Sequence, residues 1–560
     1  MTRLLAVLLL GATTLPAAVT FDALVDEFFT KAYFHFQPTI ATQAGLHQYD
    51  AQLEDYSRAQ MVDGQADVLR KYEVEFSKLK PDTLPPYARG DRQMILNYIH
   101  ATLLNLSGIR MWEKNPDIYS SGITQSAFNI MSRAYAPPAA RLQSLIAREK
   151  LMPRVFDAAR KNIKNPPRIY VEIALEQMPG EISFFEKDVP AAFSKVTDPK
   201  LLADFHQSNA AVIDSLKKYE AWMKSDLLPG AKGDFRIGED NYRKKLLTEE
   251  MVDIPLDRLL AIAFDDLRHN QQMFRETAAK IDPNRTPQQI LQEAERDHPT
   301  ADKLLQSFRD VLGGLRDFIT SHKIITIPSP VMPILEETPP FMRALTTASM
   351  DTPGAYEKVA KEAFFNVTLP EPSWTAAQTE EHLQMFNRGT IISTAIHEAF
   401  PGHYVQFLWL QGVQSKTRKL LYANTNAEGW AHYCEQMMLD EGYAKGDLKL
   451  RLGQLQDALL RDARYIVGIQ LHTNSMSIEQ GINFFVNEGM QVRALGERET
   501  KRGTSDPTYL YYTLGKLEIL KLRKDYGKSL QEFHDAFMKQ GAAPIKIVRH
   551  ALLGNDSPVL

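Results

Sequence analysis

The chain has 560 residues and a formal net charge of −4 at neutral pH, so it lacks the basic excess typical of nucleic-acid-binding proteins. Hydrophobic residues make up 44% and charged residues 24% of the sequence, an ordinary balance for a protein that buries a large core. We therefore expect neither nucleic acid nor an anionic membrane surface among its partners.

The first eighteen residues have the pattern of a secretory signal peptide. Arg3 supplies a positive start, residues 4–10 are wholly apolar, and Pro16-Ala17-Ala18 offers a cleavage zone of small residues. The apolar run is too short to span a bilayer. The pattern predicts a signal peptide over residues 1–18, no membrane span, and export to the periplasm or the exterior. A buried first helix is the alternative.

Cysteine usage is minimal, because Cys434 is the only cysteine in the chain. An exported chain with one cysteine forms no internal disulfide, so its stability must come from core packing. No cysteine lies near the cleavage zone, and we expect no lipid anchor there. Cys434 falls within an apolar helical pattern, which predicts an inert thiol in the core.

Most of the remaining chain shows the apolar spacing of amphipathic helices, with long patterns over residues 56–79, 92–107, 138–163 and 286–323. Residues 324–349 differ, because repeated prolines predict an extended, irregular connection. Residues 364–369 are aromatic and β-branched, which predicts a short strand, and helix returns from residue 379. We expect a mainly α fold with one domain over 19–560, a small strand element and a loose lobe boundary near 325–350.

The segment Ile396-His397-Glu398-Ala399-Phe400-Pro401-Gly402-His403 sets two imidazoles and a carboxylate close together. Zinc-binding helices usually carry His-Glu-x-x-His, because residues four apart face the same way. Here Pro401 occupies the second histidine position, and His403 follows His397 by six residues. Six residues turn an ideal helix by about 600°, so an unbroken helix would point the rings apart. Pro401 and Gly402 predict a bend that turns His403 back toward His397.

A second motif, Glu428-Gly429-Trp430-Ala431-His432, begins 25 residues after His403. Zinc sites with two histidines take a glutamate as third ligand, and Glu428 is the candidate. The alternative is a capping box from Thr425 to Glu428, in which the carboxylate reaches back to its helix start. His432 lies one turn after Glu428 on the same face. It could donate a hydrogen bond behind the ligands or to the transition state, replace His403, or be a core histidine.

Glu398 is the candidate general base, because an unpaired carboxylate is costly in a core and this one adjoins a predicted ligand. The sequence therefore predicts one Zn²⁺ ion held by His397, His403 and Glu428, since imidazole-rich sites favour zinc. This constellation is typical of a metallohydrolase.

Residues 397–406 and 428–433 resemble the paired motifs of the bacterial domain-of-unknown-function-885 family. That family is similar to α-helical zinc oligopeptidases and carboxypeptidases, and the likeness extends to residues 21–50 and 512–535. The resemblance implies a bilobal helical clamshell of zincin type with a deep groove. It also implies the same three metal ligands and Glu398 as the base.

Related helical peptidases stabilise the oxyanion with a late tyrosine or histidine, which implies Tyr512 or Tyr511 here. Lys516 or Arg523 would then pair with a substrate carboxylate. Simple packing is the alternative role for the tyrosines.

We therefore expect an exported zinc metallopeptidase that hydrolyses short peptides, with Glu398, Tyr512 and His432 as catalytic candidates. One rival is a metal-dependent amidase or esterase that acts on small molecules. The other is a relative that binds peptides without cleaving them. The sequence leaves the oligomeric state open.

Overall fold

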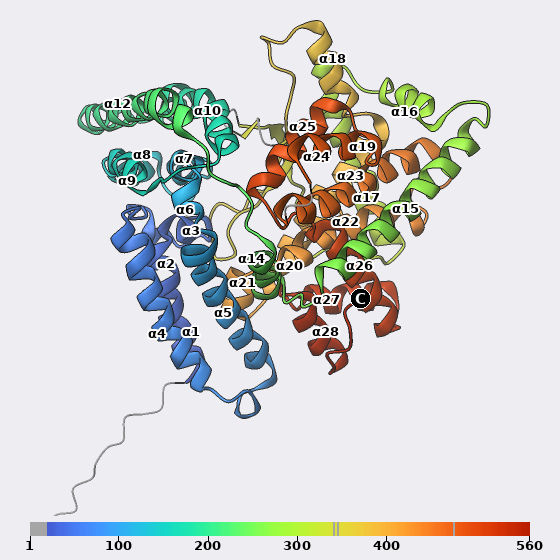
Figure 1. Cartoon of the computed structure of the whole chain (residues 1–560), viewed down its shortest axis with the longest axis horizontal. Helices are drawn as coiled ribbons and strands as arrows, with labels where there is room; N and C mark the ends of the chain where they lie inside the picture. The colour runs from blue at the N-terminus through green and yellow to red at the C-terminus, as the bar shows by residue number, and fades with distance from the viewer. Residues whose placement is uncertain (1–19, 340–341, 344–345, 474–475) are drawn as a thin grey trace, which may run out of the picture.

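The computed structural model of the chain describes residues 20–339, 342–343, 346–473 and 476–560. Within them the protein is mainly helical, as predicted, and the predicted strand belongs to a three-stranded sheet (Figure 1). The blue to teal helices up to α12 lie on one side of Figure 1, and the orange to red helices α22–α26 lie on the other. The predicted signal peptide, residues 1–18, lies outside the described residues.

The N-terminal side has short π-helical and 3-10 turns between several of its helices. The pattern over 138–163 is divided between two helices, because Pro153 lacks the N–H that a continuous helix needs. The α-helices of this side are α1 (Phe21–Phe28), α2 (Phe34–Phe36), α3 (Pro38–Gln43), α4 (Gln65–Lys78), α5 (Pro86–Leu104), α6 (Met111–Lys114), α7 (Asp117–Met131), α8 (Pro138–Glu149), α9 (Met152–Asn162), α10 (Arg168–Ser183), α11 (Val189–Ala192), α12 (Pro199–Trp222), α13 (Leu228–Gly230) and α14 (Glu239–Lys245).

The middle of the chain contains α15 (Leu256–Ile281), α16 (Pro287–Glu295), α17 (Leu304–Ser321) and the sheet. Strand β1 (Ile334–Glu337) runs parallel to β3 (Phe364–Val367), and β2 (Ala348–Asp351) runs antiparallel to it. The order β1-β3-β2 places the predicted strand, β3, in the centre and leaves β2 at an edge. Strand β1 lies within the stretch 324–349 that the sequence predicted as irregular, and β2 begins at the end of that stretch. The sequence did not reveal them, because four-residue strands among prolines carry little pattern of their own.

The C-terminal part returns to helix, as the sequence predicted. Several of its helices begin with capping boxes, for example Thr375 with Gln378 and Ser477 with Gln480. None of the helices described is long and apolar enough to cross a membrane. The helices are α18 (Ala376–Gln384), α19 (Arg388–Glu398), α20 (His403–Gly412), α21 (Lys416–Leu420), α22 (Asn424–Asp440), α23 (Leu448–His472), α24 (Ile478–Asn487), α25 (Arg493–Ser505), α26 (Tyr511–Tyr526), α27 (Leu530–Met538) and α28 (Ile545–Leu553).

One hydrophobic core joins helices from both ends of the chain. Phe28 near the N-terminus shares it with Ile396 of α19 and Trp430 of α22. This core therefore crosses the region of 325–350, while a second core is confined to the helices from α7 to α12 and the turns that follow them. Cys434 is buried in the first core, where burial raises the pKa of its thiol, as expected for an inert core residue.

Helices α22 and α26 cross in direct backbone contact. A Cβ added to Gly429 would overlap the backbone of Gly515, and a Cβ added to Gly515 would overlap the carbonyl of Thr425. Only glycine permits this approach. The crossing fixes the position of α22, and with it the residue that precedes Gly429, Glu428.

Candidate metal centre

The predicted bend between the two histidines is present as a break between two helices. Helix α19 ends at Glu398, and α20 begins at His403. Between them, the Gly402 N–H donates to the carbonyl of Ile396 over 3.0 Å, and a Cβ on Gly402 would overlap the carbonyl oxygen of His397. This tight turn between α19 and α20 places the ring centroids of His397 and His403 4.9 Å apart, with the ring planes at 89° to each other.

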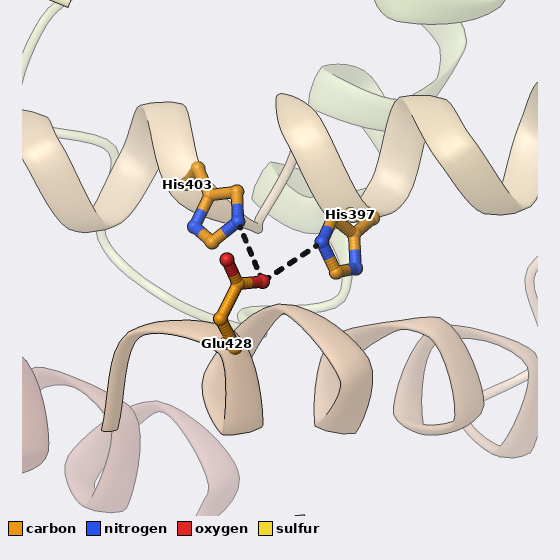
Figure 2. A group of neighbouring side chains, drawn as sticks. All are labelled: His397, His403 and Glu428. Atoms are coloured by element: carbon orange, nitrogen blue, oxygen red, sulfur yellow. Dashed lines mark ion pairs between the residues drawn. The ribbon is translucent and has the colours of Figure 1, made fainter. Parts of the chain in front are cut away.

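Glu428 completes the group from a third helix. Figure 2 shows His397 of α19, His403 of α20 and Glu428 of α22 pointing toward one another. The Oε2 atom of Glu428 lies 3.4 Å from Nε2 of His397 and 3.3 Å from Nε2 of His403. One ligand atom from each residue lies within 4.8 Å of the others. The structure therefore brings together the three residues predicted as metal ligands.

The chemistry of this cluster fits a divalent cation. Oε2 of Glu428 is buried and has no well-aligned hydrogen-bond donor among the described residues, although two imidazole nitrogens face it. Burial acts to raise the pKa of Glu428, but His403 and His397 outweigh it and lower the pKa well below its usual value. A carboxylate that stays ionised between two imidazoles matches the donor set of a zinc site.

Glu428 does not cap its own helix, so the alternative capping-box interpretation is wrong. Glu250, far away in the sequence, takes that role: its carboxylate accepts the backbone N–H of Asn424 over 3.1 Å and that of Thr425 over 2.8 Å. The Thr425 hydroxyl also donates to Glu250, over 2.7 Å. The cap by Glu250 satisfies the start of α22 and leaves Glu428 free to face the histidines.

Glu435 contacts a predicted metal ligand, and the sequence analysis did not identify it. Its Oε1 atom lies 2.7 Å from Nδ1 of His397 and 2.8 Å from a guanidinium nitrogen of Arg461. Burial acts to raise the pKa of Glu435, but Arg461 and His432 outweigh it and lower the pKa. Because an ionised carboxylate only accepts hydrogen bonds, Nδ1 of His397 must carry a proton, and Nε2 is the nitrogen that faces Glu428 and would bind a metal. Glu435 follows Glu428 by seven residues, a same-face spacing that could have indicated it.

His432 lies behind the ligands rather than among them. Its Nδ1 donates to Oε2 of Glu435 over 3.0 Å, and its side chain is fully buried. Burial lowers the pKa of His432 to about 3, so the ring is neutral. Since His403 does turn inward, the site has no need of His432 as a substitute ligand. The geometry favours a positioning role through Glu435.

Replacing Glu435 should test this positioning directly. In Glu435→Gln, the amide can still accept the hydrogen bond from the His397 ring. It no longer carries the negative charge that makes Nε2 of His397 a strong electron-pair donor to zinc. We expect zinc affinity to fall about 10- to 100-fold, measured by competition with a chromophoric chelator. Glu441→Gln, at the end of the same helix and paired with Arg523, is the control and should bind zinc normally. Unchanged affinity in a folded Glu435→Gln protein would contradict the assignment.

The cluster opens into a cavity of about 860 Å³. Its wall includes Gln177 of α10 from the N-terminal side, Met350 of β2, and Glu398 at the end of α19. Burial raises the pKa of Glu398, while the two imidazoles and the backbone N–H of Met350 act in the opposite direction. Glu398 thus lies beside the ligands and faces the same cavity, as a general base must.

Tyr512 also lines the cavity, with its ring centroid 6.2 Å from that of His397. Its hydroxyl lies 3.3 Å from a guanidinium nitrogen of Arg502. The Tyr511 hydroxyl instead donates to Asp506 over 2.8 Å, and Tyr511 is not among the residues that line the cavity. Of the two tyrosines, only Tyr512 is placed to act on a bound molecule.

Lys516 and Arg523 are not placed for the role that the family resemblance implied, which was to pair with a substrate carboxylate. Lys516 is buried in an ion pair with Asp266 at 2.8 Å, and Arg523 pairs with Glu441 at 2.9 Å. Neither lines the cavity. Both contacts join residues distant in the chain, so the sequence alone could not show that these cations were already paired.

The chain is similar to several solved structures, including two whose match covers nearly the whole chain. One is a protein from Shewanella oneidensis described as a "putative lipoprotein of unknown function": identity is 24%, the TM-score is 0.79, and the match covers 96% of this chain and 100% of that one. The other, a "putative lipoprotein" from Colwellia psychrerythraea, has 17% identity and a TM-score of 0.75, over 95% of this chain and 98% of that one. These identities establish the fold alone. No curated protein matches the chain.

A family model described as a bacterial protein of unknown function, DUF885, matches residues 38–552. The match covers both histidines, Glu428 and the cavity wall, and it confirms the resemblance seen in the two motifs. The chain belongs to the DUF885 family.

Proposed function

We propose that this protein is a zinc-dependent peptidase that hydrolyses short peptides. The observation that supports this most is the convergence of His397, His403 and Glu428 beside Glu398 at the wall of a large cavity. Two imidazoles and one carboxylate leave room for a reacting molecule at the ion, as in catalytic rather than structural zinc sites. In this proposal the mainly helical fold is a clamshell of zincin type.

A bound zinc ion would supply Lewis acidity, which acidifies water and polarises a carbonyl group. The carboxylate of Glu398 accepts a proton from the attacking water and passes it to the nitrogen of the leaving amine as the C–N bond breaks. The hydroxyl of Tyr512 donates a hydrogen bond to the oxyanion that forms when water adds to the carbonyl carbon. Glu435 holds His397 in the tautomer that the ion requires.

The edge strand β2 supports a peptide as substrate. Residues 348–350 of β2 line the cavity beside Glu398, and among the residues that the structure describes one side of this strand has no partner in the sheet. An extended peptide can form main-chain hydrogen bonds with such an edge. Export to the periplasm or the exterior remains part of the proposal, on the basis of the signal pattern at residues 1–18. The description of both structural neighbours as lipoproteins agrees with it.

Elemental analysis of purified protein beside His397→Ala tests the metal assignment. We expect about one zinc per chain in the wild type and a large loss in the variant. His206→Ala, which changes an exposed histidine on α12, should keep its zinc. Equal zinc in wild type and His397→Ala would remove His397 from the site.

Hydrolysis assays then separate the peptidase from its rivals. We expect cleavage of short peptides that a chelator abolishes and added zinc restores. Turnover of simple esters or amides alone would favour the small-molecule hydrolase. Zinc-dependent peptide binding without any turnover would favour the non-catalytic relative. Peptide hydrolysis unaffected by the chelator would refute the mechanism.

A further inference from the structure

Four arginines line one part of the cavity wall. Arg461 and Arg464 lie one turn apart on α23, and Arg498 and Arg502 lie one turn apart on α25. Residues three or four positions apart share a helix face, so both helices present guanidinium groups to the same space. The sequence analysis did not identify this group.

Three of these arginines already have carboxylate partners. Arg461 pairs with Glu435 at 2.8 Å, and Arg502 pairs with Asp506 at 3.4 Å. Arg464 forms two hydrogen bonds with the carboxylate of Glu499, of 2.7 and 2.8 Å. Such two-pronged pairs are strong and hold Glu499 in place. These residues build the wall, and their charges are largely balanced.

Arg498 differs from the other three. Among the described residues, no carboxylate lies within ion-pair distance of Arg498, and its one resolved polar contact is 3.5 Å from Nη2 to Sδ of Met385. Burial lowers the pKa of Arg498; Glu499 acts to raise it, and the neighbouring Arg464 adds to the lowering. A partly desolvated cation without its own counter-ion is costly for a protein to maintain. An anionic ligand in the cavity would offset that cost.

Two neighbours of Arg498 in this wall, Arg464 and Arg502, flank Tyr512 beside the metal ligands. The Tyr512 ring centroid lies 4.9 Å from the guanidinium carbon of Arg464, 5.9 Å from that of Arg502 and 6.2 Å from the His397 ring. Arg498 lines the same cavity as Tyr512 and interacts electrostatically with Arg464. One cavity therefore borders both the metal ligands and the four arginines.

We propose that Arg498 binds a carboxylate of the substrate, so that the enzyme selects peptides with a negative charge near the bond that is cut. This inference rests on the proposed peptidase function and specifies its substrate class. The planar guanidinium group matches a carboxylate with two parallel hydrogen bonds. The carboxylate comes either from the C-terminus of the peptide or from an aspartate or glutamate side chain.

Peptide binding can be measured apart from catalysis in a Glu398→Gln background loaded with zinc. Fluorescence anisotropy would compare four forms of one labelled peptide, which combine a free or amidated C-terminus with an internal glutamate or glutamine. Each form would be tested with Arg498→Met and with the control Arg493→Met. Arg493 lies on the same helix but is exposed and pairs with Glu479 and Glu497.

We expect Arg498→Met to weaken binding of the peptides that carry the recognised carboxylate about 10- to 100-fold and to leave the neutral peptide unchanged. Arg498→Lys should recover part of the loss, and Arg493→Met should bind like its parent. If amidation abolishes the effect, the C-terminal carboxylate is the ligand; if glutamine abolishes it, the side chain is. If Arg498→Met binds each of the four peptides as tightly as Arg493→Met does, the inference is overturned, even where the zinc-loaded wild type cleaves peptides. Failure of the wild type to cleave any peptide would instead refute the proposed function.

Discussion

Replacement of Glu398 by glutamine should abolish peptide hydrolysis while the protein keeps its zinc and its fold. Glutamine has the size of glutamate but cannot accept a proton from water near neutral pH. General-base catalysis contributes about 10²- to 10⁴-fold, so we expect kcat to fall by at least about a hundredfold with little change in KM. Steady-state kinetics and elemental analysis on the same preparation would measure both quantities.

The control for this variant is Glu381→Gln. Glu381 is an exposed glutamate that also lines the cavity, but it is not among the residues of the metal cluster. It should retain activity close to that of the wild type. Full activity in Glu398→Gln would exclude this carboxylate as the base, and loss of zinc would show that it acts on the metal site instead.

The local part of the candidate site could be predicted from the sequence. His397 and His403 are six residues apart, and the helix-breaking properties of Pro401 and Gly402 act on the backbone between them. A bend in this segment therefore follows from short-range chemistry. The helical class of the fold was equally accessible, because apolar spacing repeats along most of the chain.

Residues that act through long-range contacts could not be predicted in this way. Glu250 caps α22 from about 175 positions away, and nothing near it in the sequence indicates that role. Arg498 stands out only once the partners of its neighbouring arginines are known. The sequence suggested a substrate role for Lys516, because its ion pair with Asp266 forms only when α26 packs against α15 and is not visible in the sequence. In each case tertiary pairing decides which charges remain available to a ligand.

Gly402→Ala should remove the metal site through a single methyl group. The Cβ would overlap the carbonyl oxygen of His397, and this neighbour is backbone, which cannot rotate away as a side chain can. The turn between α19 and α20 must then open, and this opening moves His403 away from His397 and Glu428. Because zinc affinity depends on all three ligands converging, we expect affinity to fall at least about a hundredfold, with a loss of stability of about 1–3 kcal/mol.

Gly412→Ala is the matched control for this change. Gly412 lies at the end of the same α20 helix, where an added Cβ would meet no atom within 4 Å. It should bind zinc like the wild type and be at least as stable, because alanine favours helix over glycine. Chelator competition and thermal unfolding would be measured on both variants with and without zinc. Wild-type zinc affinity in Gly402→Ala would mean that the His397 carbonyl can move without displacing the His397 imidazole. The tight turn between α19 and α20 would then not be what aligns the two histidines.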